Sequence, residues 1–246
     1  MAIGGRLAET ILSRYKWHDM EAPPSYKAAT KLETLFGPSI WSDIKDKIVL
    51  DFGCGDGMES LEMARRGARH VFGLDIQEQL LMTARTQAVG IDNCTFVQRF
   101  TSRADLIVSV DSFEHFCRPD LVLREMATIL VPGGKVLVSF GPPWYHPKGG
   151  HFQLFPWAHL LLKESALMTW RSRWKTDGAT RFEEVAGGLN QMSVGKFERL
   201  VADSPLKLAD FETVPIQAVR WLHCRLTREL FTSVVRCTLV ARSYAP

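Results

Sequence analysis

A cluster of glycines and carboxylates near residue 50 has the composition of a ligand-binding turn. Glycine occupies every second position of Gly53-Cys54-Gly55-Asp56-Gly57, and Asp51 stands shortly before it. Glycine lets the backbone turn sharply and approach a ligand closely. A bound pyrophosphate needs backbone N–H groups without carboxylates beside them. The two acids therefore favour a ligand with a cationic part.

A further acid follows at the spacing of a nucleoside-binding unit. Asp75 ends the apolar run Val71-Phe72-Gly73-Leu74, roughly 20 residues after the glycine turn. Such units place at this point the carboxylate that accepts hydrogen bonds from ribose hydroxyls. The turn and the acid, in this order, predict a nucleoside-binding crevice.

Three histidines are candidates for proton transfer. His115 follows an apolar run that ends at Val110, and His146 and His151 flank Lys148-Gly149-Gly150. An imidazole with an ordinary pKa of about 6.5 suits removal of a proton from a hydroxyl group. We expect His115 to have the best position, and the alternative for it is a structural histidine bonded to a neighbouring loop.

A metal site is the other chemistry that these residue types allow. Asp111 and Glu114 stand near the histidines in the sequence, and all five side chains are of types that ligate metals. Their spacing matches no diagnostic ligand pattern, so we predict no metal.

The segments around these residues alternate between strand and helix patterns. Short apolar runs predict strands at 48–52, 70–74, 94–97, 105–110, 135–140 and 207–215, and a last strand within 231–242. Apolar residues at helical spacing predict helices at 58–66, 79–89, 119–130, 193–204 and 218–230. Ser193 is the predicted cap of one helix, and Pro132-Gly133-Gly134 is a predicted turn. This alternation is typical of a doubly wound α/β sheet.

The segment from 141 to 192 interrupts the alternation. It begins with a loop rich in Gly, Pro and aromatic residues, and an apolar helix is predicted from Phe152 to Met168. It also contains four of the seven tryptophans. Long loops are usually functional or disordered, and the aromatic content argues against disorder. We expect a lid that binds a substrate.

Four segments resemble the motifs of class I S-adenosylmethionine-dependent methyltransferases, of a type-11-like kind. They are Val49 to Gly57, Gly73 to Asp75, Asp105 to His115 and Leu130 to Val138. The resemblance covers residues 45–140 well. It implies an α/β fold: a Rossmann-like doubly wound sheet of seven strands, mostly parallel with the last strand antiparallel. A helical lid insertion after strand five is added to it.

The resemblance also implies S-adenosyl-L-methionine as the cofactor and assigns residues to it. Asp51 would lie near the methionine ammonium, Asp75 would accept the ribose hydroxyls, and Ile76 would lie against the adenine. The full cofactor-binding set is Asp51, Gly53, Cys54, Gly55, Gly57, Asp75, Ile76, Asp111 and Ser112. An aromatic residue of the N-terminal region, Trp17 or Tyr26, is a candidate to cover the cofactor.

One segment departs from the family pattern. Many relatives follow strand three with a glycine and an acid that contacts the adenine, whereas this chain has Gln98-Arg99-Phe100-Thr101. Either Phe100 stacks on the base or backbone groups bind it.

We predict one methyltransferase domain over residues 1–246. Its parts are an N-terminal helical cover (1–46), a cofactor-binding core (47–140), the substrate lid (141–192), and a C-terminal helix with strands six and seven (193–246). The N-terminal region is expected to hold a helix within 1–20 and another from Tyr26 to Phe36, capped by Ser25. The first helix packs on the domain or folds over the cofactor.

Composition places limits on the class of protein. The chain has 246 residues, 46% of them hydrophobic, which is enough for one full α/β core. The net charge of +3 is small for a nucleic-acid-binding protein. The five cysteines form no C-x-x-C pair, which is typical of reduced thiols in the cytoplasm. No run is long enough to span a membrane.

The leading functional hypothesis is a transferase that methylates the hydroxyl group of a small-molecule or sugar-like acceptor. A methyltransferase acting on RNA, a peptide or a protein is the first alternative, with a basic rim formed by Arg171, Arg173, Lys175, Arg181, Arg220, Arg225 and Arg228. The others are a non-catalytic cofactor-binding module and a nicotinamide oxidoreductase. The G-x-G-x-G spacing and the loop carboxylates oppose the last. The sequence leaves the acceptor and the oligomeric state open.

Overall fold

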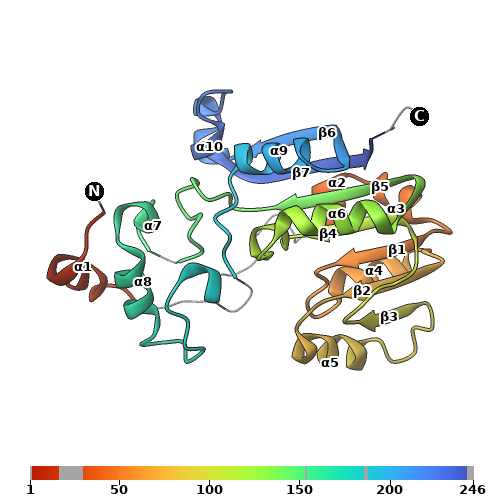
Figure 1. Cartoon of the computed structure of the whole chain (residues 1–246), viewed down its shortest axis with the longest axis horizontal. Helices are drawn as coiled ribbons and strands as arrows, with labels where there is room; N and C mark the ends of the chain where they lie inside the picture. Colours follow the sequence, from red (N-terminus) through yellow and green to blue (C-terminus); the bar gives the residue numbers. More distant parts are fainter. Residues whose placement is uncertain (1, 17–29, 153, 186–187, 243–246) are drawn as a thin grey trace.

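Short runs rich in Val, Ile, Leu and Phe form one mixed sheet in the computed structural model, which describes residues 2–16, 30–152, 154–185 and 188–242 (Figure 1). Within these residues the sheet has seven strands in the order β3-β2-β1-β4-β5-β7-β6. They are β1 (Ile48–Phe52), β2 (His70–Leu74), β3 (Cys94–Val97), β4 (Ala104–Val110), β5 (Leu130–Phe140), β6 (Leu206–Pro215) and β7 (Thr232–Ala241). Strands β1 to β5 pair in parallel, and β7 is antiparallel to β5 and β6. The predicted fold class is confirmed.

Helices cover both faces of the sheet. One face packs against α6 (Pro119–Ile129) and α9 (Val194–Ala202) through a core that includes Leu123, Met126 and Phe197. The other packs against α2 (Lys31–Phe36), α3 (Ile40–Ile44) and α4 (Met58–Arg65). Helix α5 (Glu78–Gln87) packs on Phe96 of β3. The carboxyl ends of the parallel strands are left free for a ligand site.

Side-chain caps fix where two of these helices begin. The Ser193 hydroxyl accepts a hydrogen bond from the Lys196 N–H at 3.2 Å, which confirms the predicted cap of α9. The helix predicted from Tyr26 begins at Lys31 instead, because the Thr30 hydroxyl accepts from the Glu33 N–H and caps it there. Ser25, Tyr26 and Trp17 lie outside the described residues.

Two predicted helices are wrong because contacts distant in sequence or local side chains break them. The segment predicted as helix from Phe152 to Met168 holds two short helices, α7 (Ala158–Leu161) and α8 (Glu164–Arg171). Leu162 between them is extended, because it pairs with Ile3. The segment predicted as helix over 218–230 divides into η4 (Gln217–Leu222) and α10 (Arg228–Phe231). There the Thr227 hydroxyl donates to the Leu222 carbonyl and competes with helical bonding.

Strand β5 begins at Leu130, earlier than predicted. Its pairing with β4 shifts register between Ala104 and Leu106, so the predicted turn at Pro132-Gly133-Gly134 is a bulge at the start of the strand. Gly133 has a left-handed backbone (φ 81°), which such an irregularity requires.

A small helical lobe stands beside the sheet and combines a helix of the predicted N-terminal cover with the segment predicted as the lid. Helix α1 (Gly5–Leu12) packs on α8, and its Ala8 and Leu12 join a core with the buried tryptophans Trp144 and Trp170 (Figure 1). The lobe therefore contains α1, α7, α8 and η3 (Phe182–Glu184). The N-terminal helix packs on the insertion, and these two tryptophans form the core of the lobe.

The remaining compositional features are compatible with this architecture. No helix among the described residues is long and apolar enough to cross a membrane. All five cysteines carry free thiols, and burial raises the pKa of the Cys54 and Cys237 thiols well above the ordinary value. These two thiols stay protonated and act as small apolar side chains.

The packing of β2 on β3 generates the first prediction. A Cβ added at Gly73 would lie 2.4 Å from Cδ1 of Phe96 and 3.0 Å from Sγ of Cys54. We expect Gly73→Ala to lower the free energy of unfolding by about 1–3 kcal/mol, because the buried ring must move. Chemical denaturation would measure it. Phe96→Leu should recover much of the loss in the double variant, and purely additive losses would contradict the assignment.

Candidate functional site

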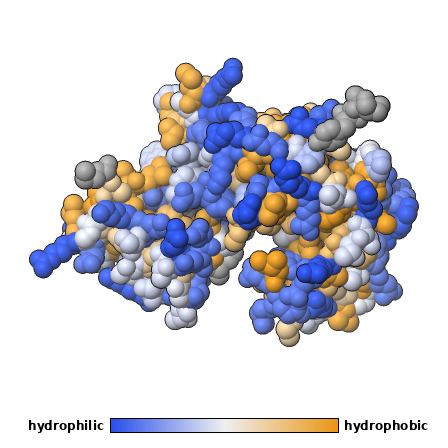
Figure 2. Space-filling view, viewed as in Figure 1, coloured by the Kyte–Doolittle hydropathy of each residue, from blue (hydrophilic) through white to orange (hydrophobic). Residues whose placement is uncertain are grey.

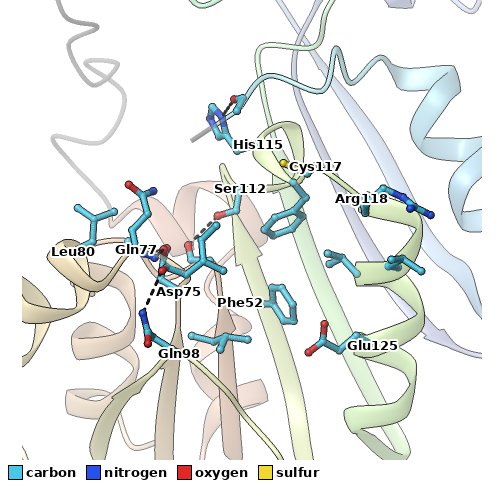
Figure 3. A pocket seen from close by; sticks show the side chains of 18 of the residues that line it. Phe52, Asp75, Gln77, Leu80, Gln98, Ser112, His115, Cys117, Arg118 and Glu125 are labelled. Atoms are coloured by element: carbon cyan, nitrogen blue, oxygen red, sulfur yellow. Dashed lines mark hydrogen bonds between the residues drawn. The ribbon is translucent and has the colours of Figure 1, made fainter. Parts of the chain in front are cut away.

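A cavity of about 800 Å³ lies at the carboxyl ends of β1, β2 and β4, between the sheet and the helical lobe (Figure 3). Figure 2 shows the surface hollowed between the two parts. The volume is in the range of small-molecule sites. Predicted cofactor or catalytic residues in its lining are Gly53, Gly55, Asp75, Ile76, Asp111, Ser112 and His115.

The glycine turn reaches the cavity by passing close to the end of β4. Gly53 has a left-handed backbone (φ 83°), and a Cβ there would lie 2.6 Å from Oγ of Ser112. The Ser112 hydroxyl is 2.9 Å from the carbonyl oxygens of both Gly53 and Val110, to which it can donate. The contact ties the turn to β4 and leaves the backbone of Gly53 and Gly55 facing the cavity.

Asp75 stands at the end of β2 with both carboxylate oxygens oriented by the backbone. Its Oδ2 accepts from the Gly55 N–H at 3.0 Å, and its Oδ1 accepts from the Gln77 N–H at 2.8 Å. Each oxygen keeps a second lone pair for another donor. Gln77 and Gln98 lie beside Asp75 on the same side of the cavity (Figure 3). This arrangement can accept two hydroxyl groups of a sugar ring.

Asp111 directly follows β4 and belongs to an ion-pair network with the N-terminal region. The Lys31 ammonium lies 3.1 Å from Asp111 Oδ2 and 3.0 Å from Glu59 Oε1. Burial of the ammonium opposes its charge, but the carboxylates of Asp111 and Glu59 raise the pKa of Lys31 above its ordinary value. The network joins α2 to the site through a permanently charged lysine, a residue that the sequence interpretation did not single out.

His115 occupies the opposite side of the cavity from Gln98 (Figure 3). Its Nδ1 lies 2.6 Å from the carbonyl oxygen of Gly188, an acceptor, so Nδ1 carries the hydrogen. The neutral ring then has its lone pair on Nε2. The geometry provides a proton acceptor beside the cavity, held in place by a residue of the segment next to the helical lobe.

The other two candidate histidines lie outside the cavity lining. The His151 ring packs edge-on against the His115 ring, with centroids 5.4 Å apart. Burial lowers the pKa of His151 to about 4, and its Nε2 is buried without a partner. Burial likewise lowers the pKa of His146 to about 4, and its Nδ1 accepts from the Lys148 N–H at 2.9 Å. His151 supports His115 from behind, whereas His146 belongs to its own loop, and the catalytic role of each stays a prediction.

Three predicted cofactor residues also lie behind the lining. Asp51 is buried and accepts a hydrogen bond from the Ser60 hydroxyl, and burial raises its pKa to about 7. The Cys54 thiol packs under the turn among apolar residues. A Cβ at Gly57 would lie 2.5 Å from the Phe96 ring. The structure gives these residues a role in shaping the turn, and their contact with a cofactor remains a prediction.

The segment after β3 supplies polar groups. Gln98 and Arg99 line the cavity, and Gln98 Nε2 donates to the Ile76 carbonyl at 3.4 Å. Phe100 is outside the lining and packs against Phe72, with ring centroids 5.0 Å apart. Between the two alternatives for a bound base, the structure favours polar and backbone groups over stacking on Phe100.

A buried carboxyl group underlies the site next to His115. Glu114 accepts from the Gly141 N–H at 3.1 Å through Oε1, and its Oε2 is buried without a partner. Burial raises the pKa of Glu114 to about 8, and the nearby Asp111 adds to the effect. Among the described residues, no group of three or more His, Cys, Asp or Glu side chains could hold a metal ion.

A second cavity, of about 550 Å³, continues on the other side of His115. It shares His115, Cys117, Arg118, Glu183 and Gly188 with the first. Apolar groups of the lobe, among them Phe182 and Leu189, form another part of its wall. None of the tryptophans of 141–192 lines either cavity. The arrangement offers adjacent spaces for two ligands with His115 between them.

Sequence patterns did not identify several lining residues. Gln77, Phe116, Arg118 and Gly188 line the cavity from loops or from the segment next to the lobe. The place of Gln77 in the lining could have been predicted from the sequence, because it stands two residues after Asp75, the acid at the end of β2. The others carry no motif, since their positions depend on how the chain returns after β4 and after η3.

Comparisons with known proteins agree with this geometry. Residues 49–134 match a family model described as a methyltransferase domain. The chain is 34% identical over 143 residues to a ubiquinone biosynthesis O-methyltransferase of Aeromonas salmonicida, a match over 53% of this chain and 58% of that protein. It is also 34% identical to the protein of that name from Neisseria meningitidis serogroup C, over 40% of this chain and 45% of that protein. The chain thus spans about half the length of the curated relatives it matches.

A solved structure shows the same fold at low sequence identity. The crystal structure of an S-adenosylmethionine-dependent methyltransferase from Mesorhizobium loti superimposes with a TM-score of 0.55. The match covers 84% of this chain and 97% of that chain at 19% identity. At this identity the comparison supports the fold alone.

The buried Glu114 carboxyl predicts a pH-dependent stability. The folded chain holds this proton up to about pH 8, whereas the unfolded chain releases it near the ordinary pKa of 4.5. The free energy of unfolding therefore falls as pH rises from about 4.5 to about 8, because the folded state binds more protons there. We expect Glu114→Gln to raise the melting temperature at pH 8.5 by a few degrees, since about 1 kcal/mol shifts it by roughly 2–4 °C.

Thermal melts between pH 5 and pH 8.5 would measure this effect. At pH 5 the variant and the wild type should melt alike, because both side chains are then neutral. Glu9→Gln, at an exposed position on α1, is the control and should leave the melting temperature unchanged at both pH 5 and pH 8.5. An equal loss of stability at every pH would contradict a protonated Glu114.

Proposed function

We propose that the chain is an S-adenosylmethionine-dependent methyltransferase that methylates the hydroxyl group of a small molecule, and the match of residues 49–134 to a methyltransferase domain supports this. One observation carries the proposal: Asp75 and His115 line the same cavity from opposite sides. The first provides acceptors for the cofactor, and the second provides a base for the substrate.

The residues present fit S-adenosylmethionine as the cofactor. The Asp75 carboxylate keeps two free lone pairs for ribose hydroxyls, and the backbone of Gly53 and Gly55 approaches without side chains. Asp111 provides a carboxylate for an ammonium group, and the exposed Ile76 provides an apolar surface for a base. When bound, this cofactor supplies a methyl group on a good leaving group, its sulfonium.

The contribution of the chain is to orient the acceptor and remove its proton. His115 donates through Nδ1 to the Gly188 carbonyl, so its Nε2 is free to accept a proton from a hydroxyl group. A general base of this kind typically contributes about 10²–10⁴-fold in rate. Phe116 and Val185 line the same cavity and add apolar surface to its wall.

Two sets of observations support a small acceptor. The relatives from Aeromonas salmonicida and Neisseria meningitidis are named O-methyltransferases of ubiquinone biosynthesis. The basic rim expected for a macromolecular acceptor is partly neutralised, because Arg171 pairs with Asp177, Arg181 with Glu183, and Arg228 with Glu198. Phenols and catechols are therefore the acceptors to test first, with a labelled methyl donor as the readout.

The cofactor contact gives the next prediction. Asp75→Asn should weaken binding of S-adenosylhomocysteine by about 10–100-fold, because it removes a charged acceptor worth roughly 1.5–3 kcal/mol. Isothermal titration calorimetry would measure the dissociation constant. Asp56→Ala is the matched control, since it removes an exposed carboxylate of the same turn outside the cavity lining. Equal affinities of Asp75→Asn and wild type would remove Asp75 from the cofactor site.

The role of His115 gives a separate prediction. His115→Gln should lower kcat by about 10²–10⁴-fold, because glutamine can still donate to Gly188 but cannot take up the proton. Affinity for S-adenosylhomocysteine should change little. The control is His70→Gln, far from the cavity at the start of β2. If kcat with a phenolic acceptor were unchanged, the base would be another group.

A further inference from the structure

The chain between β6 and β7 forms an exposed tip. This segment, residues 217–227, contains η4 and the turn before α10, and no residue of η4 or α10 is buried. In Figure 1 it rises beyond the ends of β6 and β7 at the top of the view. Trp221 is 78% exposed and Leu226 is 92% exposed. Two large apolar side chains therefore project from one short protruding segment.

The base of the tip is fixed, so these side chains have a defined position. Glu229 accepts from the N–H groups of Val194 and Gly195 at 3.1 and 2.7 Å, where α9 begins. Arg228 forms a two-pronged ion pair with Glu198 of α9. The segment is thus fastened to the sheet domain directly behind the tip.

The tip carries positive charge next to its apolar side chains. Arg220 and Arg225 are exposed and form no ion pair with any residue that the structure describes. The neighbouring acid, Glu229, is already engaged by backbone N–H groups of α9. Figure 2 shows strongly hydrophilic and hydrophobic side chains together at this end of the molecule.

We propose that the tip docks on the surface of an anionic lipid bilayer. Tryptophan prefers the boundary between headgroups and acyl chains, and an exposed leucine gains by entering the acyl region. Each arginine near an anionic surface adds about 1 kcal/mol of attraction. The combination of Trp221, Leu226, Arg220 and Arg225 on one projection matches these three preferences.

The topology places the tip at the same end of the sheet as the cavity, the end formed by the carboxyl ends of the parallel strands. Strand β7 is antiparallel to both β5 and β6, so β6 runs in the same direction as β5 and the other parallel strands. The tip follows the carboxyl end of β6, and the cavity lies at the carboxyl ends of β1, β2 and β4. A docked bilayer would therefore face the end of the sheet at which the cavity lies.

A lipid surface suits the tip better than a second copy of the chain. Stable protein interfaces bury about 800 Å² on each partner. A projection with two apolar side chains and two like-charged arginines offers a small contact area and repels its own copy. Phosphate headgroups, in contrast, attract both arginines.

Co-sedimentation with vesicles tests the proposal. The wild-type chain should bind vesicles of phosphatidylcholine containing phosphatidylglycerol more tightly than pure phosphatidylcholine, and high salt should weaken the binding. Trp221→Ser/Leu226→Ser should lower the partition coefficient by about tenfold or more. Arg220→Gln/Arg225→Gln should lower it by roughly fivefold for each arginine, the equivalent of about 1 kcal/mol per charge.

Matched variants control for surface exposure and total charge. Trp174→Ser removes another exposed tryptophan, from the helical lobe. Arg65→Gln/Arg69→Gln removes two exposed arginines near the start of β2, at the amino ends of the parallel strands and away from the tip. Both should bind vesicles like the wild type or nearly so. All variants should keep the melting temperature and the affinity for S-adenosylhomocysteine, which separates this test from that of the methyltransferase proposal.

Three results would overturn the proposal. The first is wild-type chain that binds neither kind of vesicle. The second is binding that Trp221→Ser/Leu226→Ser leaves unchanged. The third is a dimer, measured by light scattering, that this double variant converts to a monomer without any vesicle binding, because the tip would then be a contact between copies.

Discussion

The close approach of the glycine turn to the end of β4 determines where the site forms. Ser112 lies within hydrogen-bond distance of the Gly53 carbonyl, and a Cβ at Gly53 would collide with that hydroxyl. The strand order changes direction between β1 and β4, so their carboxyl ends border the crevice of a doubly wound sheet. Only glycine lets the two ends meet, and the cavity follows from their meeting.

That constraint also explains the charges of the site. The turn brings the Gly55 N–H to one oxygen of Asp75, and the other oxygen accepts from the Gln77 N–H just beyond β2. Asp51 and Glu114 are buried beneath the same junction, and burial raises the pKa of each. The only lysine or arginine in this ion-pair network among the described residues is Lys31, held between Asp111 and Glu59. The junction thus concentrates carboxyl groups around a space that suits a sugar and a cationic group.

Sequence patterns predicted the parts whose causes are local. The bounds of β1, β2 and β3 were predicted to the residue, because short apolar runs with glycine or acidic ends are nearly sufficient for buried strands. The helix predicted across Leu162 was wrong because Leu162 pairs with Ile3, which is distant in the chain. In the site, Asp75 and Asp111 were predicted to face the cavity and line it, whereas Asp51 was predicted beside the cofactor and is buried behind the lining. Gly188 was not predicted, because its place depends on the path of a loop.

Different parts of the chain position the two sides of the site. The cofactor side is made from the sheet, within the residues 49–134 that match the methyltransferase domain. The proposed acceptor side depends on the chain after that match, since the Gly188 carbonyl orients His115, and Val185 and Glu183 line the cavity with it. A change in the helical lobe can therefore reach the proposed base, His115, through one hydrogen bond, while the glycine turn keeps its own contacts.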